Sequence, residues 1–260
     1  MTAWFAGCLV RPVLAEEGIL RWSGIYDSIR KATPHTAPTG LISIENTHNM
    51  AGGFAYPMET IHEICDNAHA MGIRVHMDGA RIFNAACATG RPVSEIADKA
   101  DTVMFCLSKG LGAPVGSMVV GGEEIIEEAR LYRKRLGGGM RQAGVLAAAG
   151  LIAIEEMPKR LGEDHANARF LATELAKLPG IRLDPAKVQT NIVVFDISAT
   201  GFETSEFIPL LRRHGVRMSY ANARDMRAVT HYDVSRADCE RAVEAVAQAL
   251  GVAQTSKASH

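Results

Sequence analysis

Two short motifs of this chain place an acid and an amine where a cofactor could bind. Asp78 follows the apolar run 73–77, and Lys109 follows the apolar run 102–107, with a glycine directly after the lysine. If these runs are neighbouring strands of a parallel sheet, both side chains lie outside the carboxyl ends of their strands. Such sheets bind their ligands at that edge. We therefore expect Asp78 and Lys109 to face a common site.

This pair of groups suits pyridoxal 5'-phosphate. The cofactor forms a Schiff base between its aldehyde and a lysine, and its ring nitrogen pairs with a carboxylate. Lys109 would be the Schiff-base lysine, and desolvation at the mouth of the sheet would favour its neutral, nucleophilic amine. Asp78 would keep the ring nitrogen protonated. The pattern alone leaves simpler alternatives open: Lys109 as a solvated loop residue, and Asp78 as a turn or helix cap.

Three arginines near such motifs could bind anions. Arg81, one turn after Asp78, could hold a carboxylate through two parallel hydrogen bonds, although a surface salt bridge is the simpler alternative. Arg227 opens an apolar strand, where its charge needs a partner such as a substrate carboxylate. Arg141 follows three glycines at the expected start of a helix and is well placed for an anion.

The elements that would position these side chains alternate between strand and helix. Apolar runs predict strands at 41–45, 73–77, 102–107 and 117–120. Helical spacing and charge patterns predict helices at 57–71, 93–99 and 123–135. This order favours βαβ units and a mainly parallel sheet.

From about residue 155 the pattern changes to that of a small α+β domain. A long apolar helix starts near Arg141, and Pro158 divides it from a second helix over 163–178. Beyond it we expect strands at 181–183, 190–197, 216–219 and 226–229, with helices at 204–214 and 235–250. The predicted division is a large domain over 1–154 and a small domain over 155–260.

Composition excludes several classes of function. The 260 residues carry a formal net charge of −1, which gives no electrostatic case for nucleic acid. The five cysteines are odd in number and widely spaced, which predicts reduced thiols in the cytoplasm rather than disulfides or a metal site. No apolar run approaches the length of about 18 residues that a membrane span needs, and the apolar opening lacks the basic start of a signal peptide.

Longer segments around these residues resemble the threonine aldolases. The matching segments are 45–49, 76–81, 106–117, 137–142 and 229–233, in the family's order. The resemblance runs from about Arg11 to about Leu250. It implies the α/β fold of the aspartate-aminotransferase-like, fold type I enzymes, with a large pyridoxal-phosphate-binding domain and a small α+β C-terminal domain. The implied activity is cleavage of L-threonine or L-allo-threonine to glycine and acetaldehyde, by a homo-oligomer.

The resemblance also implies roles for individual positions. Lys109 matches the Schiff-base lysine and Asp78 the partner of the pyridine nitrogen. Arg81 and Arg227 match the pair that binds the amino acid carboxylate. The remaining matches are Ser108 and Arg141 on the phosphate side, with Arg141 serving a neighbouring subunit, Lys134 as a basic residue of the active site, and His35 near the substrate hydroxyl.

One family feature has no counterpart here. Family members carry an opening segment that supplies a glycine-threonine turn for the phosphate, a histidine stacked on the ring and a serine near the substrate. None of these has a match between Met1 and Arg11, so we expect a chain that lacks them. Two alternatives therefore stay open: a catalytically impaired homologue that acts as a cofactor-poor oligomer partner, and another fold type I lyase acting on β-hydroxy amino acids.

Overall fold

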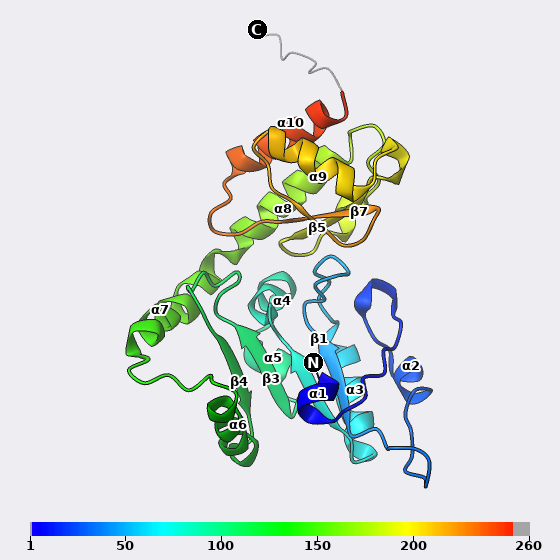
Figure 1. The fold of residues 1–260 in the computed structure, drawn as a ribbon, viewed down its shortest axis with the longest axis vertical. Coiled ribbons are helices and arrows are strands. Elements are labelled where there is room, and N and C mark those ends of the chain that lie inside the picture. The colour runs from blue at the N-terminus through cyan, green and yellow to red at the C-terminus, as the bar shows by residue number, and fades with distance from the viewer. Residues whose placement is uncertain (1, 252–260) are drawn as a thin grey trace.

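The computed structural model describes residues 2–251, which form two sheets with helices around each (Figure 1). The larger sheet has its strands in the order β1 (Leu41–Glu45), β2 (Arg74–Asp78), β3 (Thr102–Cys106) and β4 (Ser117–Gly121). The first three strands are parallel, and β4 is antiparallel to β3. The segment between β3 and β4 is too short for a helical crossover, so the chain returns in the opposite direction. The expected mainly parallel sheet is confirmed.

The core of this part lies between the sheet and the helix α3 (Met58–Ala70). Val75 and Met77 of β2 are fully buried, as are Ile61 and Ile64 of the helix. Fully burying an aliphatic side chain of this size contributes about 1.5–3 kcal/mol. Gly72 ends the helical segment with a φ of +70°, which lets the chain turn into β2. Two short helices, α4 (Ile82–Thr89) and α5 (Val93–Ala97), connect β2 to β3.

The smaller sheet is antiparallel, with its strands in the order β5 (Ile192–Asp196), β7 (Asp225–Val229) and β6 (Ser219–Tyr220). Its helices are α8 (Leu161–Leu175), α9 (Thr204–Arg213) and α10 (Arg236–Ala249). Phe195, Phe207 and Leu175 are completely buried in the shared core. Figure 1 shows this part above the larger sheet.

A helical segment joins the two parts. It comprises α6 (Glu123–Arg135), α7 (Gly144–Glu155), a 3-10 helix (Met157–Arg160) and α8. Ala153 and Leu161, on either side of the 3-10 helix, pack with Leu107 and Leu111 in a separate apolar cluster. This junction therefore supports the loop that follows β3. The proposed domain boundary falls within it, and residues 252–260 of the proposed small domain lie outside the described residues.

Several predicted elements need correction. The helix Ile82–Thr89 was not expected, because its alanine-rich sequence has no clear polar face. The predicted strand 181–183 is a single bridge between Arg182 and Asp196, and the strand 216–219 is reduced to Ser219–Tyr220. The helix expected near Arg141 begins at Gly144, since the preceding glycines and Gln142, with a φ of +50°, keep the chain irregular. Two short helices near the start, α1 (Thr2–Ala6) and α2 (Trp22–Tyr26), were also not predicted.

Over residues 2–251, no helix combines the length and the apolar character needed to cross a membrane.

Candidate active site

Asp78 ends β2 at the carboxyl edge of the parallel strands. Its register partners are Glu45 on β1 and Met104 on β3. The Asp78 carboxylate is half-buried and accepts a hydrogen bond from the Ala80 amide at 3.0 Å. The Gly79 amide donates to the Met104 carbonyl at 2.7 Å, and a Cβ at Gly79 would lie 2.9 Å from that oxygen. Glycine therefore lets the chain stay close to β3 directly after Asp78.

Lys109 lies in the loop that follows β3, at the same edge of the sheet and one strand further along. The loop is closed by hydrogen bonds from the Leu107 amide to the Gly116 carbonyl, at 3.0 Å, and from the Ala113 amide to the Leu107 carbonyl, at 2.9 Å. The Lys109 side chain is exposed. The expected position of Asp78 and Lys109 beyond the ends of neighbouring strands is thus observed, whereas the expected burial of Lys109 is wrong.

A buried polar pair lies beneath the lysine loop. A Cβ at Gly110 would come within 3.2 Å of both Asn84 Oδ1 and Leu161 Cδ2. Asn84 Nδ2 donates a hydrogen bond to His165 Nε2 at 3.1 Å, and both side chains are buried. Burial lowers the pKa of His165 from 6.5 to about 4. Sequence reasoning missed this pair, since its members come from α4 and α8, 81 residues apart.

Two arginines meet at one neutral oxygen beside this edge. Arg81 Nη1 donates to Asn49 Oδ1 at 2.9 Å, and Arg227 Nη2 donates to the same oxygen at 2.6 Å. Within residues 2–251, neither guanidinium has a carboxylate within ion-pair distance, and both Nε atoms are buried without an acceptor. Burial lowers the pKa of both guanidinium groups, and the charge of Arg227 lowers that of Arg81 further.

The three side chains come from distant parts of the chain. Arg81 directly precedes α4, Arg227 lies within β7 of the smaller sheet, and Asn49 lies in the loop after β1. The Asn49 amide donates to Glu45 Oε1 at 3.0 Å, which fixes the loop to the end of its strand. Two guanidinium groups that lack a direct ion-pair partner among the described residues and share one hydrogen-bond acceptor form a site for a carboxylate. The role of Asn49 was not predicted, because no local pattern marks it.

The other predicted site residues are all exposed: His35, Ser108, Lys134 and Arg141. Ser108 Oγ donates weakly to the Gly116 carbonyl at 3.5 Å. Arg141 lies in the segment between α6 and α7, three residues before the first residue of α7, so its expected place at a helix start is wrong. Among the described contacts, no hydrogen bond or ion pair joins these four side chains to Asp78, so their roles stay predictions.

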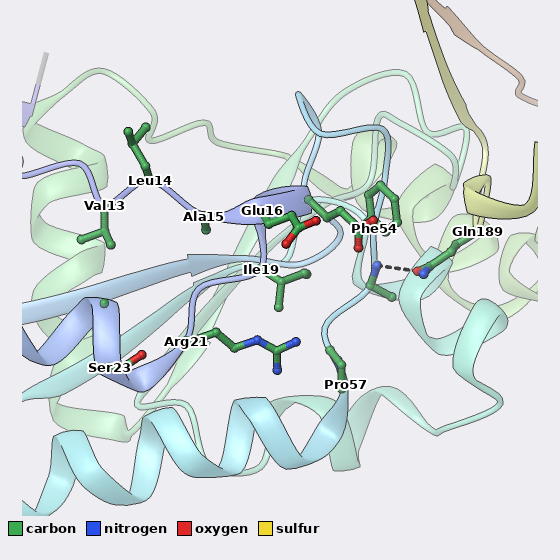
Figure 2. A pocket seen from close by; sticks show the side chains of 13 residues that line it. Val13, Leu14, Ala15, Glu16, Ile19, Arg21, Ser23, Phe54, Pro57 and Gln189 are labelled. Atoms are coloured by element: carbon green, nitrogen blue, oxygen red, sulfur yellow. Dashed lines mark hydrogen bonds between the residues drawn. The ribbon is translucent and has the colours of Figure 1, made fainter. Parts of the chain in front are cut away.

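Two pockets lie elsewhere. A pocket of about 530 Å³ is lined by Arg212, Gly215 and Arg217. A second pocket, of about 380 Å³, lies between the segment 13–24 and the segment 54–57, where the Ala55 amide donates to Gln189 Oε1 at 3.0 Å (Figure 2). Neither pocket is lined by a predicted site residue. In the described part of the chain, no group of three or more metal-binding side chains is present.

Comparison with known proteins identifies the family. The sequence model of the beta-eliminating lyases matches residues 1–198. The chain belongs to the beta-eliminating lyase family. The chain is 39% identical over 238 residues to low-specificity L-threonine aldolase 1 of Arabidopsis thaliana, an alignment that covers 90% of this chain and 66% of that protein. It is also 39% identical over 223 residues to the low specificity L-threonine aldolase of Escherichia coli, covering 85% and 64%. The chain thus spans just under two thirds of the length of these relatives.

Solved structures show the same fold. The threonine aldolase of Leishmania major aligns with a TM-score of 0.72 at 20% identity, over 91% of this chain and 69% of that one. A PLP-dependent aminotransferase of Streptococcus suis aligns with a TM-score of 0.70 at 20% identity, over 92% and 63%. The expected fold type I architecture and the resemblance to threonine aldolases are both confirmed.

Proposed function

We propose that this chain is a pyridoxal-phosphate-dependent aldolase that cleaves L-threonine or L-allo-threonine to glycine and acetaldehyde. The observation that carries the proposal is the convergence of Arg81 and Arg227 on Asn49 Oδ1, because two guanidinium groups without a direct ion-pair partner suit the carboxylate of an amino acid. The names of the relatives support the same reaction.

The groups at the sheet edge suit the cofactor. Lys109 offers an exposed amine for an aldehyde, and Asp78 offers a half-buried carboxylate for a ring nitrogen on the neighbouring strand. Nearby, the Asn46 amide donates to the Asp78 carbonyl at 2.8 Å, while Asn46 Nδ2 and Thr47 Oγ1 are buried without partners. Such orphaned polar atoms are costly unless a ligand satisfies them. When bound, pyridoxal phosphate supplies a ring that accepts the electron pair released by cleavage of the Cα–Cβ bond.

Each residue then has a defined task. Arg81 and Arg227 bind the substrate carboxylate and thereby orient the Cα–Cβ bond. Asp78 holds a proton at the ring nitrogen, and Lys109 binds the cofactor covalently. His35 accepts the proton of the β-hydroxyl, directly or through water.

Three further residues belong to the phosphate side of the site, and one of them acts across a subunit interface. Ser108, Lys134 and Arg141 contact the phosphate side of the site, and Arg141 does so in a neighbouring subunit of a homo-oligomer. The large domain over 1–154 carries the cofactor, while the small domain over 155–260 carries Arg227. The exposure of Lys134 and Arg141 is compatible with a site that a second subunit completes.

The test is release of glycine and acetaldehyde from L-threonine and L-allo-threonine after addition of pyridoxal phosphate. We expect both products from the wild-type protein, and their loss in Lys109→Ala. Lys99→Ala, which removes a surface lysine paired with Asp66, is the matched control and should stay active. Absence of turnover in the wild type would favour the impaired homologue, and cleavage of other β-hydroxy amino acids alone would favour a different lyase.

A further inference from the structure

The shared acceptor of the two arginines is an asparagine rather than an acid. Asn49 Oδ1 accepts hydrogen bonds of 2.9 and 2.6 Å from Arg81 and Arg227, and Arg81 is only 9% exposed. The Arg227 guanidinium otherwise donates only to Ser219 Oγ, at 3.4 Å, among the described residues. One neutral oxygen therefore holds two like charges together, although these charges repel each other.

The neutrality of this acceptor has a chemical consequence. An aspartate at position 49 would form a charge-assisted, two-sided contact with the guanidinium groups and neutralise one of them. The amide satisfies a hydrogen bond from each arginine but leaves both charges in place. A carboxylate that arrives from solution thus finds two guanidinium groups that share one acceptor and lack a direct ion-pair partner among the described residues.

Asn49 is also held by both halves of the molecule. Its loop is closed by the His48 amide, which donates to the Phe54 carbonyl at 3.0 Å. Thr190, which directly precedes the core of the smaller sheet, donates its hydroxyl to the Gly53 carbonyl at 2.8 Å. A Cβ at Gly53, whose φ is +79°, would lie 2.3 Å from that hydroxyl, so only glycine permits the contact. The loop therefore fixes Asn49 where Arg81 and Arg227 can both reach it.

We propose that Asn49 is a positioning residue, a neutral stand-in for the substrate carboxylate that holds Arg81 and Arg227 at one point until the carboxylate replaces its oxygen as acceptor. This inference rests on the proposed function for the identity of the carboxylate. Asn49 takes no part in the chemical steps of this proposal and acts only on the binding of the substrate carboxylate. A charge at position 49 should therefore change the affinity for the substrate.

Kinetics with Asn49→Asp test the proposal. The introduced carboxylate competes with that of the substrate, so KM for L-threonine should rise by roughly 10- to 100-fold, the range expected for loss of a hydrogen bond to a charged group. The change in kcat should be much smaller. Asn49→Ala removes the acceptor without adding charge and should raise KM less. Asn67→Asp places the same charge on α3, where Asn67 Nδ2 bonds only the Glu63 carbonyl, and should keep the wild-type KM.

A binding measurement gives a readout that does not depend on turnover. Formate, the simplest carboxylate, is titrated into the protein while the Nε–H resonances of Arg81 and Arg227 are followed by NMR. In the wild type both resonances should shift along one saturation curve. In Asn49→Asp they should start near the saturated position and respond at least tenfold more weakly. Equal formate responses and equal KM values in the wild type and Asn49→Asp would overturn the inference while leaving aldol cleavage intact. A normal formate response without any turnover would instead remove only the proposed function.

Discussion

Arg81 and Arg227 gain their significance from an acceptor that is distant from both in sequence. Each arginine alone resembles a surface residue with an unassigned partner. Arg81, Arg227 and Asn49 come from three different segments of the chain. Asn49 and Arg227, which are hydrogen-bonded, are 178 residues apart in the sequence. The candidate role of the two arginines in binding a carboxylate was predictable from the sequence. The asparagine was not, because a long-range polar contact leaves no periodic or local pattern.

His165 offers a test of the buried polar pair beneath the lysine loop. Its folded-state pKa of about 4 lies below the ordinary value of 6.5, so its stabilising contribution is complete above pH 6.5 and is lost as the pH falls toward 4. Each pH unit in this window costs the fold about 1.4 kcal/mol, which amounts to about 3 kcal/mol by pH 4. Urea unfolding across this pH window should show that the free energy of unfolding falls more steeply in the wild type than in His165→Gln. Glutamine can accept the hydrogen bond from Asn84 but does not titrate.

The control for this measurement is His214→Gln, which changes an exposed histidine after α9. It should reproduce the wild-type dependence on pH. Parallel stability curves for the wild type and His165→Gln would show that the buried histidine does not carry the acid sensitivity.

The strands and helices differ in how accurately the sequence predicts them. The helix over 123–135 was predicted to the residue, because its charged ends match the helix dipole and glycines flank it. The strands 41–45, 102–107 and 117–120 were correct within one residue. The helix Ile82–Thr89 escaped prediction, since a short apolar run has no distinctive period. The prediction of a strand at 181–183 is wrong, because this segment pairs with β5 at only one residue, Arg182, and so forms a single bridge.

Gly79 tests the spacing between β2 and β3. Gly79→Ala places a Cβ 2.9 Å from the Met104 carbonyl oxygen and 3.1 Å from Ile82 Cβ, so the two strands must move apart behind Asp78. Overpacking of this kind costs about 1–3 kcal/mol. Thermal and urea unfolding should show this loss. Gly40→Ala, at a position with nothing within 4 Å of the added Cβ, is the control and should be nearly neutral. Equal stability of the two variants would contradict the close strand contact.

The distribution of exposed apolar side chains concerns the assembly of the whole chain. All five residues of β4 are exposed, and α6 has no buried residue. The exposed apolar residues of these two elements, together called the β4–α6 face, include Met118, Val119, Val120, Leu131 and Tyr132. Exposed apolar side chains on two elements that contact each other are typical of an interaction surface. It supports the proposed homo-oligomer, whose subunits would cover it.

Sedimentation velocity tests this assembly. The wild type should sediment as a dimer or larger oligomer, and the double variant Val119→Glu/Leu131→Glu should sediment as a single chain. Both side chains are already exposed, so the variant should retain its circular dichroism spectrum. A wild type that stays monomeric at micromolar concentration, or an oligomer unaffected by the two glutamates, would refute this use of the β4–α6 face.

The most direct test of the account concerns the amine at position 109. The protein is mixed with one equivalent of pyridoxal phosphate and reduced with borohydride, and the site of the added mass is mapped by peptide mass spectrometry. Lys109 should carry the label in the wild type, and Asp78→Ala should lower its occupancy because the ring loses its carboxylate partner. Labelling spread over the surface lysines, unchanged by Lys109→Arg, would contradict the proposed active site.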